Sequence, residues 1–199
     1  MLEYFLISLF LLTPIQSAHF RGGTIYWIPV DPTTTSSTVV VTVIQTYLWR
    51  LSAVPCVYTG FATSGYIPCV TDCSTSGSYT STTLSAQTTC ISSSPSIDAM
   101  TGQGIRNIAL DAESHFTIAY QGNAWISLVN SYSLGGGKWS ISTVIDLRRR
   151  ADGIFNTPPM SYVQSPQFVV LNKTKSISIP VFDINTGDDV RCRWAQYSR

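Results

Sequence analysis

Charge is scarce in this sequence. Lys, Arg, Asp and Glu make up 12% of the 199 residues, with twelve basic and eleven acidic side chains. Soluble globular chains average about 25% charged residues. Because there is no basic surplus, a nucleic-acid partner is not expected. The chain has only two histidines, His19 and His115, and no G-x-S-x-G sequence, so nothing local supports a nucleophilic triad.

Long apolar runs are also absent, and none reaches the roughly 18 residues that a membrane-spanning helix needs. The longest run, Leu2–Leu12, contains one acidic and one hydroxyl residue, and its length is typical of the apolar region of a signal peptide. Small residues follow at Ser17 and Ala18. We predict that residues 1–17 are a signal peptide and that the protein is extracellular, secreted or part of a cell-surface ectodomain. Any membrane anchor is expected outside this chain.

Four of the five cysteines fall close together, and the fifth stands alone near the end: Cys56, Cys69, Cys73 and Cys90, then Cys192. In a chain with a signal peptide, the cluster predicts two disulfides with three possible pairings. The spacings lack the paired CxxC sequences of structural zinc sites. Cys192 has no partner in the cluster, and we expect its partner to lie beyond Arg199.

The remaining composition favours β-structure, because Ser, Thr and aromatic residues are abundant and typical helix-forming residues are few. Alternating apolar residues predict a hairpin of two strands and four shorter strands: 23–30 with 38–51, then 106–112, 115–122, 124–130 and 138–147. Turns are predicted at Gly122-Asn123 and at Gly135–Gly137. This spacing predicts an all-β fold with a β-sandwich over residues 18–150. The tryptophans and tyrosines are expected to pack in its core rather than to form a carbohydrate platform.

Residues 55–96 contain the clustered cysteines and interrupt the strand pattern. Between Thr71 and Ser96, sixteen of 26 residues are Ser or Thr. Such a segment buries too little apolar surface to fold by hydrophobicity alone. We therefore expect an insertion within the sandwich that is held in place by its disulfides.

The pattern changes again after Arg148–Arg150, where a charge run precedes the paired prolines Pro158-Pro159. Prolines cannot continue the interior of a sheet. We predict a linker over residues 151–165 and the start of a second β domain over residues 166–199. A segment of that length is too short to close a core of its own.

Two stretches resemble a known type of protein. The sequence HFRGGTIYW, residues 19–27, resembles the N-terminal module of large secreted or cell-surface proteins of invertebrates. The sequences NTPPMSYVQSP and ISIPVFDINTGDDVRCRW resemble the start of the cadherin-like or immunoglobulin-like repeat that follows that module. The resemblance implies an extracellular interaction or adhesion module without enzymatic activity. Its expected partner is an extracellular protein or glycan, and no resident cofactor is expected.

The repeats in such proteins carry an acidic turn, and here the corresponding turn is longer. Asp183, Asp188 and Asp189 could supply oxygen ligands to calcium. The alternative, which we favour, is an ordinary polar turn in which Asp, Asn and Gly serve the backbone. Asn172 begins the chain's N-glycosylation sequon, Asn172-Lys173-Thr174.

One enzymatic alternative depends on the signal cleavage site. A cut after Ala18 would make His19 the first residue, with a free amine beside its imidazole. Together with His115 it could then chelate copper, as in lytic polysaccharide monooxygenases, which are also secreted β-sandwiches. The alternative function is therefore a secreted copper-dependent polysaccharide oxidase.

Overall fold

Strands β1 (Phe20–Pro29) and β2 (Thr38–Arg50) form the hairpin that the alternating sequence predicts. The structure is a computed structural model, and it describes residues 19–58, 65–126, 137–161 and 167–194. The predicted signal peptide lies outside these residues. Regular structure within them is almost entirely β-strand, which confirms the all-β prediction. No helix in these ranges is long and apolar enough to cross a membrane.

The first layer of the fold is built on β2. Strand β5 (Ala99–Asp111) pairs with β2 along its whole length, and β4 (Thr89–Ser94) pairs with the first half of β5. The order across this layer is β4-β5-β2-β1.

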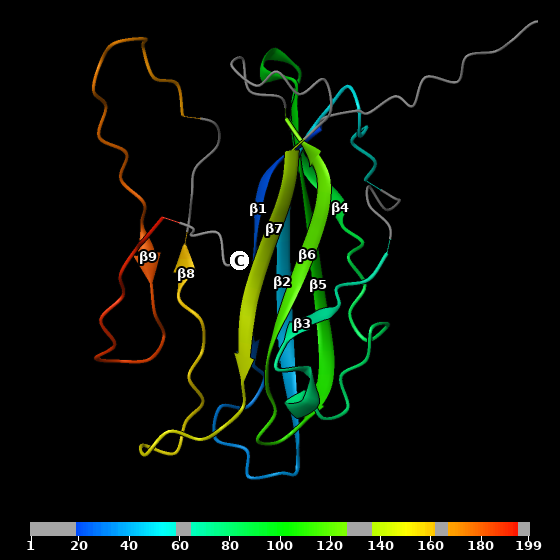
Figure 1. The fold of residues 1–199 in the computed structure, drawn as a ribbon, viewed down its shortest axis with the longest axis vertical. Coiled ribbons are helices and arrows are strands. Elements are labelled where there is room, and N and C mark those ends of the chain that lie inside the picture. Colours follow the sequence, from blue (N-terminus) through cyan, green and yellow to red (C-terminus); the bar gives the residue numbers. More distant parts are fainter. Residues whose placement is uncertain (1–18, 59–64, 127–136, 162–166, 195–199) are drawn as a thin grey trace, which may run out of the picture.

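The second layer is built on β6 (His115–Trp125), which pairs with β7 (Gly137–Asp146) and with the short β3 (Cys69–Thr71). Figure 1 shows β6 and β7 in front of the first layer. The layers meet where Phe20 of β1 pairs in parallel with Trp125 of β6, so the seven strands form one sheet folded onto itself. The Trp27 indole N–H also donates across the layers to the Val144 carbonyl at 2.7 Å.

Alternation places one side of each long strand between the layers. The largest side chains fully buried there include the aromatic residues Phe20, Trp27, Tyr47 and Phe116. Phe20 stacks on Trp139, with ring centroids 3.7 Å apart. The expectation that aromatic residues pack in the core is confirmed for this group.

The turn predicted at Gly122-Asn123 is wrong, because β6 continues through both residues to Trp125. Gly122 lies opposite Trp139 in the ladder, and a Cβ there would meet the indole ring at 2.7 Å. The glycine is needed for this close approach and not for a turn. The predicted strand 124–130 is described only as far as residue 126, and the turn at Gly135–Gly137 lies outside the described residues except for Gly137, which begins β7.

The insertion, residues 55–96, contributes more to the core than its composition suggests. It carries β3, β4 and two short 3-10 helices, Cys73–Thr75 and Pro95–Ile97. Three of its large apolar side chains are buried in the core, Ile67, Tyr79 and Leu84, whereas others, such as Tyr66 and Ile91, are exposed. Residues 65–67 also pair with residues 84–86 through backbone hydrogen bonds. Apolar burial therefore supplements the disulfides in holding the segment in place.

The C-terminal segment lies beside β1 and β7 (Figure 1). It contains a two-stranded sheet of β8 (Met160–Ser161) and β9 (Val181–Phe182). Residues 167–180 form no strand and are exposed, although their sequence alternates. Within the predicted linker, Thr157 is buried and donates to the buried Asn185 side chain, whose amide in turn donates to the Phe155 carbonyl.

Candidate functional site

The outward side of the β1-β2-β5 sheet is the main candidate surface. Alternation fixes which residues lie there, because Ile25 and Trp27 of β1 and the neighbouring valines of β2 face the core. None of the outward residues between the two ends of the sheet is charged: Thr24, Tyr26, Ile28, Val40, Thr42, Ile44, Thr46, Leu48, Thr101, Gln103, Ile105, Asn107 and Ala109. We call this surface the uncharged face.

Strand register arranges the uncharged face in rows that run across the three strands. Tyr26, Ile44 and Ile105 are aligned as an apolar central row. One flanking row consists of Thr24, Thr46 and Gln103, and the other of Ile28, Thr42 and Asn107. Ile105 is 53% exposed. The apolar row is thus exposed at Ile105 and half-buried at Ile44 and Tyr26, and hydroxyl and amide groups lie on both sides of it.

Two cross-strand hydrogen bonds orient the polar rows. The Thr42 hydroxyl donates to the Asn107 side-chain oxygen at 2.8 Å, and the Gln103 amide donates to the Thr46 hydroxyl oxygen at 3.4 Å. Because each amide is held at one atom, its other polar atom is directed away from the shared bond. Among the described residues, the Asn107 side-chain N–H groups and the Gln103 side-chain oxygen have no other hydrogen-bond partner.

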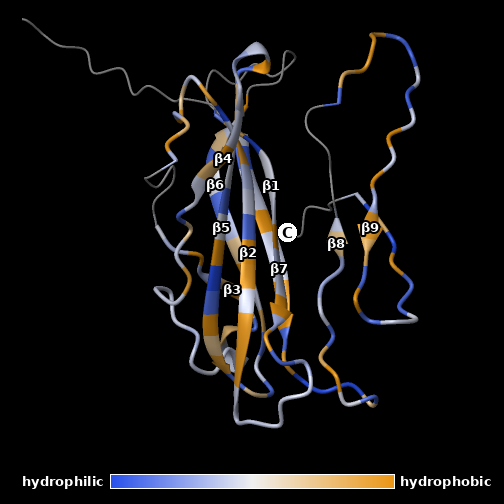
Figure 2. Ribbon diagram, turned by 180° about the vertical axis from the view of Figure 1, so that it is seen from behind, coloured by the Kyte–Doolittle hydropathy of each residue, from blue (hydrophilic) through white to orange (hydrophobic). Residues whose placement is uncertain are grey.

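Charged groups bound the uncharged face at its ends. At one end Arg50 pairs with Asp98 at 2.6 Å, and Asp98 also accepts hydrogen bonds from Ser52. The Arg50 guanidinium, followed by the Ser52 backbone N–H, lowers the pKa of Asp98 to about 2. At the other end Asp111 lies opposite Thr38. The C-terminal segment stands to one side of the sheet and does not cross β2 or β5 (Figure 2).

The outward side of the second layer differs in its charge. On β7, the residues Thr143 and Ile145 face the core, so Lys138, Val144 and Asp146 lie on the outward side. Val144 is 56% exposed, close to the value for Ile105. This surface serves as a control for the uncharged face. It belongs to the same protein and has an apolar residue of similar exposed fraction, but it also carries charged residues.

A second candidate is an open cleft of about 620 Å³ between the β1 and β7 strands and the C-terminal segment, and Thr24 and Tyr26 at the edge of the uncharged face also line it. Asp183, Asp188 and Asp189, the predicted calcium ligands, all line it. Asp188 pairs with Arg150 at 2.7 Å, which lowers the pKa of that carboxyl, and Asp189 pairs with Arg191.

Asp183 serves its own turn, because its side chain accepts the Asn185 backbone N–H. Within the described residues, no group of three His, Cys, Asp or Glu side chains is arranged to hold a metal ion. The structure therefore places the three carboxylates around one cleft but engages each with a different partner.

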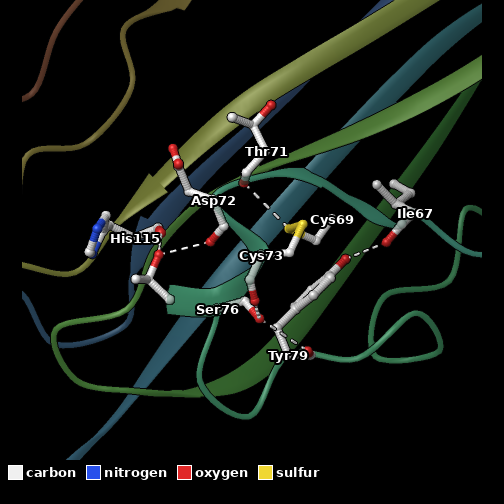
Figure 3. The surroundings of a disulfide bond; sticks show 9 residues. Ile67, Cys69, Thr71, Asp72, Cys73, Ser76, Tyr79 and His115 are labelled. Atoms are coloured by element: carbon white, nitrogen blue, oxygen red, sulfur yellow. Dashed lines mark hydrogen bonds between the residues drawn. A yellow bond between two sulfur atoms is a disulfide. The ribbon is translucent and has the colours of Figure 1, made fainter.

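The clustered cysteines form two disulfides, as predicted, and the structure resolves their pairing as Cys56–Cys90 and Cys69–Cys73. Cys56–Cys90 ties the start of the insertion to β4. Cys69–Cys73 closes a short loop between β3 and the first 3-10 helix (Figure 3). This loop is anchored to the second layer, because the Thr75 hydroxyl donates to the His115 carbonyl at the start of β6.

The two histidines proposed as copper ligands lie at opposite ends of β6. His19 donates its backbone N–H to the Ala124 carbonyl and stacks on Trp49, whereas His115 begins the strand. At about 3.3 Å per residue, the intervening strand separates them by about 30 Å. The structure does not bring this pair together, so they do not form the predicted copper site.

The remaining predicted residues lie in the C-terminal segment. Asn172, the glycosylation acceptor, is exposed and adopts a positive φ of 60° in a turn. Cys192 is a free, exposed cysteine, and Trp194 is 94% exposed. Residues 191–194 form no strand and are exposed.

Comparisons with known proteins identify no relative of this chain, since no protein-family model, curated protein or solved structure matches it. The resemblance to invertebrate cell-surface modules stays an expectation. Sequence reasoning missed the uncharged face, although its signal was present as the low charge of residues 38–48 and 101–109.

Proposed function

We propose that this protein is an extracellular, non-enzymatic interaction module and that the uncharged face is the surface that binds its partner. The observation that carries the proposal is the absence of charge from a partly exposed sheet surface that is three strands wide. Soluble proteins are designed with surfaces that are about 25–35% Lys, Arg, Glu and Asp. Charged side chains make a solvated surface more soluble. On a binding surface they weaken the complex, because they must lose their hydration when the partner binds.

Two further features support the proposal. The two disulfides are compatible with an oxidising, extracellular setting. The rows on the uncharged face are held by cross-strand pairing and hydrogen bonds on long strands rather than on loops, so little ordering is needed when a partner binds.

The cleft supports an interaction site less well. Its acidic groups are engaged with arginines or with backbone N–H groups of the same protein. A charged partner would have to compete with these contacts, so the cleft offers less free bonding capacity than the uncharged face.

A pair of matched substitutions tests the proposal. Ile105→Lys places a charge on the uncharged face, and Val144→Lys places one at a similarly exposed position on the other layer beside the cleft. Each variant is tested against an array of purified extracellular proteins and glycans, after its thermal unfolding is shown to match that of the parent protein. We expect the parent and Val144→Lys to bind a common ligand that Ile105→Lys binds at least about tenfold more weakly.

Loss of binding in Val144→Lys alone would assign the interaction to the cleft and overturn the proposal. Equal binding by all three proteins would also contradict it, as would binding by none of them.

A further inference from the structure

We infer that the ligand of the uncharged face is a neutral glycan, a chain of sugar rings without carboxylate or sulfate groups. This inference rests on the proposed function and names the ligand class for the same surface. It follows from the charge, the row chemistry and the size of the face.

The charge of the face excludes acidic glycans and favours neutral ones. Sulfated or carboxylated sugars are bound by Arg and Lys, which form charge-assisted hydrogen bonds. The rows between Val40 and Leu48 contain neither residue type. A charged ligand would lose its hydration there without gaining a counter-charge, and this loss is costly. A ligand whose polar groups are all hydroxyls or amides avoids that cost.

The row chemistry matches a sugar ring. A pyranose ring has faces formed by C–H groups and a rim of hydroxyls. The apolar row of Tyr26, Ile44 and Ile105 can contact a C–H face, and an aromatic ring such as that of Tyr26 combines apolar area with a polar tip. The flanking rows then meet the hydroxyl rim with hydrogen-bonding groups of both kinds, the Asn107 N–H donors and the Gln103 oxygen acceptor.

A protein partner fits the same surface less well. Hot spots of protein interfaces are enriched in Trp, Tyr and Arg, whereas Thr, Val and Leu are under-represented. The uncharged face has a single tyrosine and no Trp or Arg, and Thr is its commonest residue.

The size of the face also argues against a second copy of this chain as the occupant. Five rows spaced about 6.8 Å apart and three strands spaced about 4.8 Å apart give a footprint of about 500 Å². Stable protein interfaces bury about 800 Å² on each partner. A glycan segment needs no such area, because small ligands gain more binding free energy per atom.

Sedimentation with insoluble polysaccharides tests the inference. The parent protein, Tyr26→Ala, Ile105→Lys and the control Val144→Lys are mixed with chitin, cellulose or neutral β-glucan, and heparin-coated beads serve as the anionic probe. We expect the parent and Val144→Lys to bind at least one neutral polysaccharide with little dependence on salt, because no ion pair is involved. Tyr26→Ala and Ile105→Lys should bind at least about tenfold more weakly.

The outcomes separate this inference from the proposed function. If none of the neutral polysaccharides binds while a purified protein binds in a manner sensitive to Ile105→Lys, the glycan inference is wrong and the proposed function stands. Salt-sensitive binding to heparin alone would likewise overturn the inference. If no ligand of either class depends on Ile105, both proposals fail.

Discussion

Removal of the Cys56–Cys90 disulfide should destabilise the fold more than removal of Cys69–Cys73. The two bridges lie in the same insertion, but they restrict the unfolded chain to very different degrees. Cys56–Cys90 spans a sequence separation of 34, whereas Cys69–Cys73 spans only 4. The comparison therefore isolates loop length within one protein.

The loop-closure relation gives the expected magnitudes. A closed loop of 34 residues corresponds to about 4 kcal/mol of free energy of unfolding at 25 °C, and a loop of 4 residues to about 2 kcal/mol. Cys90 is also buried, so replacing its sulfur with hydrogen adds a small packing loss. We expect Cys56→Ala/Cys90→Ala to lose about twice the stability that Cys69→Ala/Cys73→Ala loses.

Urea unfolding without reducing agent, followed by tryptophan fluorescence, measures both variants against the parent protein. The fluorescence reports on the core because Trp27 and Trp49 are buried. Equal losses in the two variants, or a larger loss for the short loop, would refute the entropic reasoning. In that case the local contacts of each bridge, such as the Thr75 hydrogen bond to β6, would account for its contribution.

Three other predictions concern the core and the titratable groups. Gly104→Ala should lower the free energy of unfolding by about 1–3 kcal/mol, because its Cβ would lie 2.7 Å from the Gln87 carbonyl oxygen. The control Gly137→Ala, whose Cβ would have its nearest contact at 3.6 Å, should change the free energy of unfolding little in the same urea titration. Similar losses of stability in the two variants would contradict the steric argument. The pKa of Asp98 is lowered to about 2 in the folded protein. The contribution of its carboxylate to stability is therefore complete above about pH 3.9, its pKa in the unfolded chain, and is lost as the pH falls towards 2. Asp98→Asn should therefore flatten the fall in thermal stability over that range, and an unchanged slope would count against the Arg50 contact. Burial raises the pKa of Tyr47, so the contribution of its neutral phenol to stability is complete below about pH 10 and is lost above that pH. Tyr47→Phe should therefore reduce the loss of thermal stability at alkaline pH. Equal losses per pH unit in the variant and the parent protein would show that other groups dominate.

The periodic segments could be predicted from sequence because their side chains face two different environments. In β2, every second residue from Val39 to Trp49 is buried, and the residues between them are half-buried or exposed. The same contrast located β7 to within a residue at each end. Where one side of a strand faces the core and the other faces water, the alternation of apolar and polar residues alone is sufficient to predict the strand.

The first half of β5 escaped prediction because no such contrast marks it. Gly102 and Gly104 occupy inward positions, where a Cβ would collide with Thr88 and with the Gln87 carbonyl. The residues 84–88 cross the strand there, and the Ser85 carbonyl accepts a hydrogen bond from the buried Gln45 side chain. Glycine was required by a contact with a segment distant in sequence, so the local pattern could not reveal a strand.

The candidate site was hidden for a related reason. Alternation assigns Tyr26, Ile44 and Ile105 to the outward side of their strands, but only the register places them in one row. β1 and β2 are joined by a loop of eight residues, 30–37, whereas β2 and β5 are separated by the whole insertion. Because the pairing of β2 with β5 depends on how that insertion folds, the row could not be derived from local sequence.

The lack of charge on this face is not explained by the requirements of the fold. Strand propensity accounts for Thr, Ile and Val at these positions, but it does not forbid Lys or Asp, since the outward side of β7 carries both at Lys138 and Asp146. Core packing does not act on outward residues, and solubility favours charge at exposed sites. Arg50 and Asp111 appear where the rows end, so charge is tolerated on the same strands. Charge is scarce throughout the chain, and contact with an uncharged ligand, as proposed above, fits the chemistry of the rows between them.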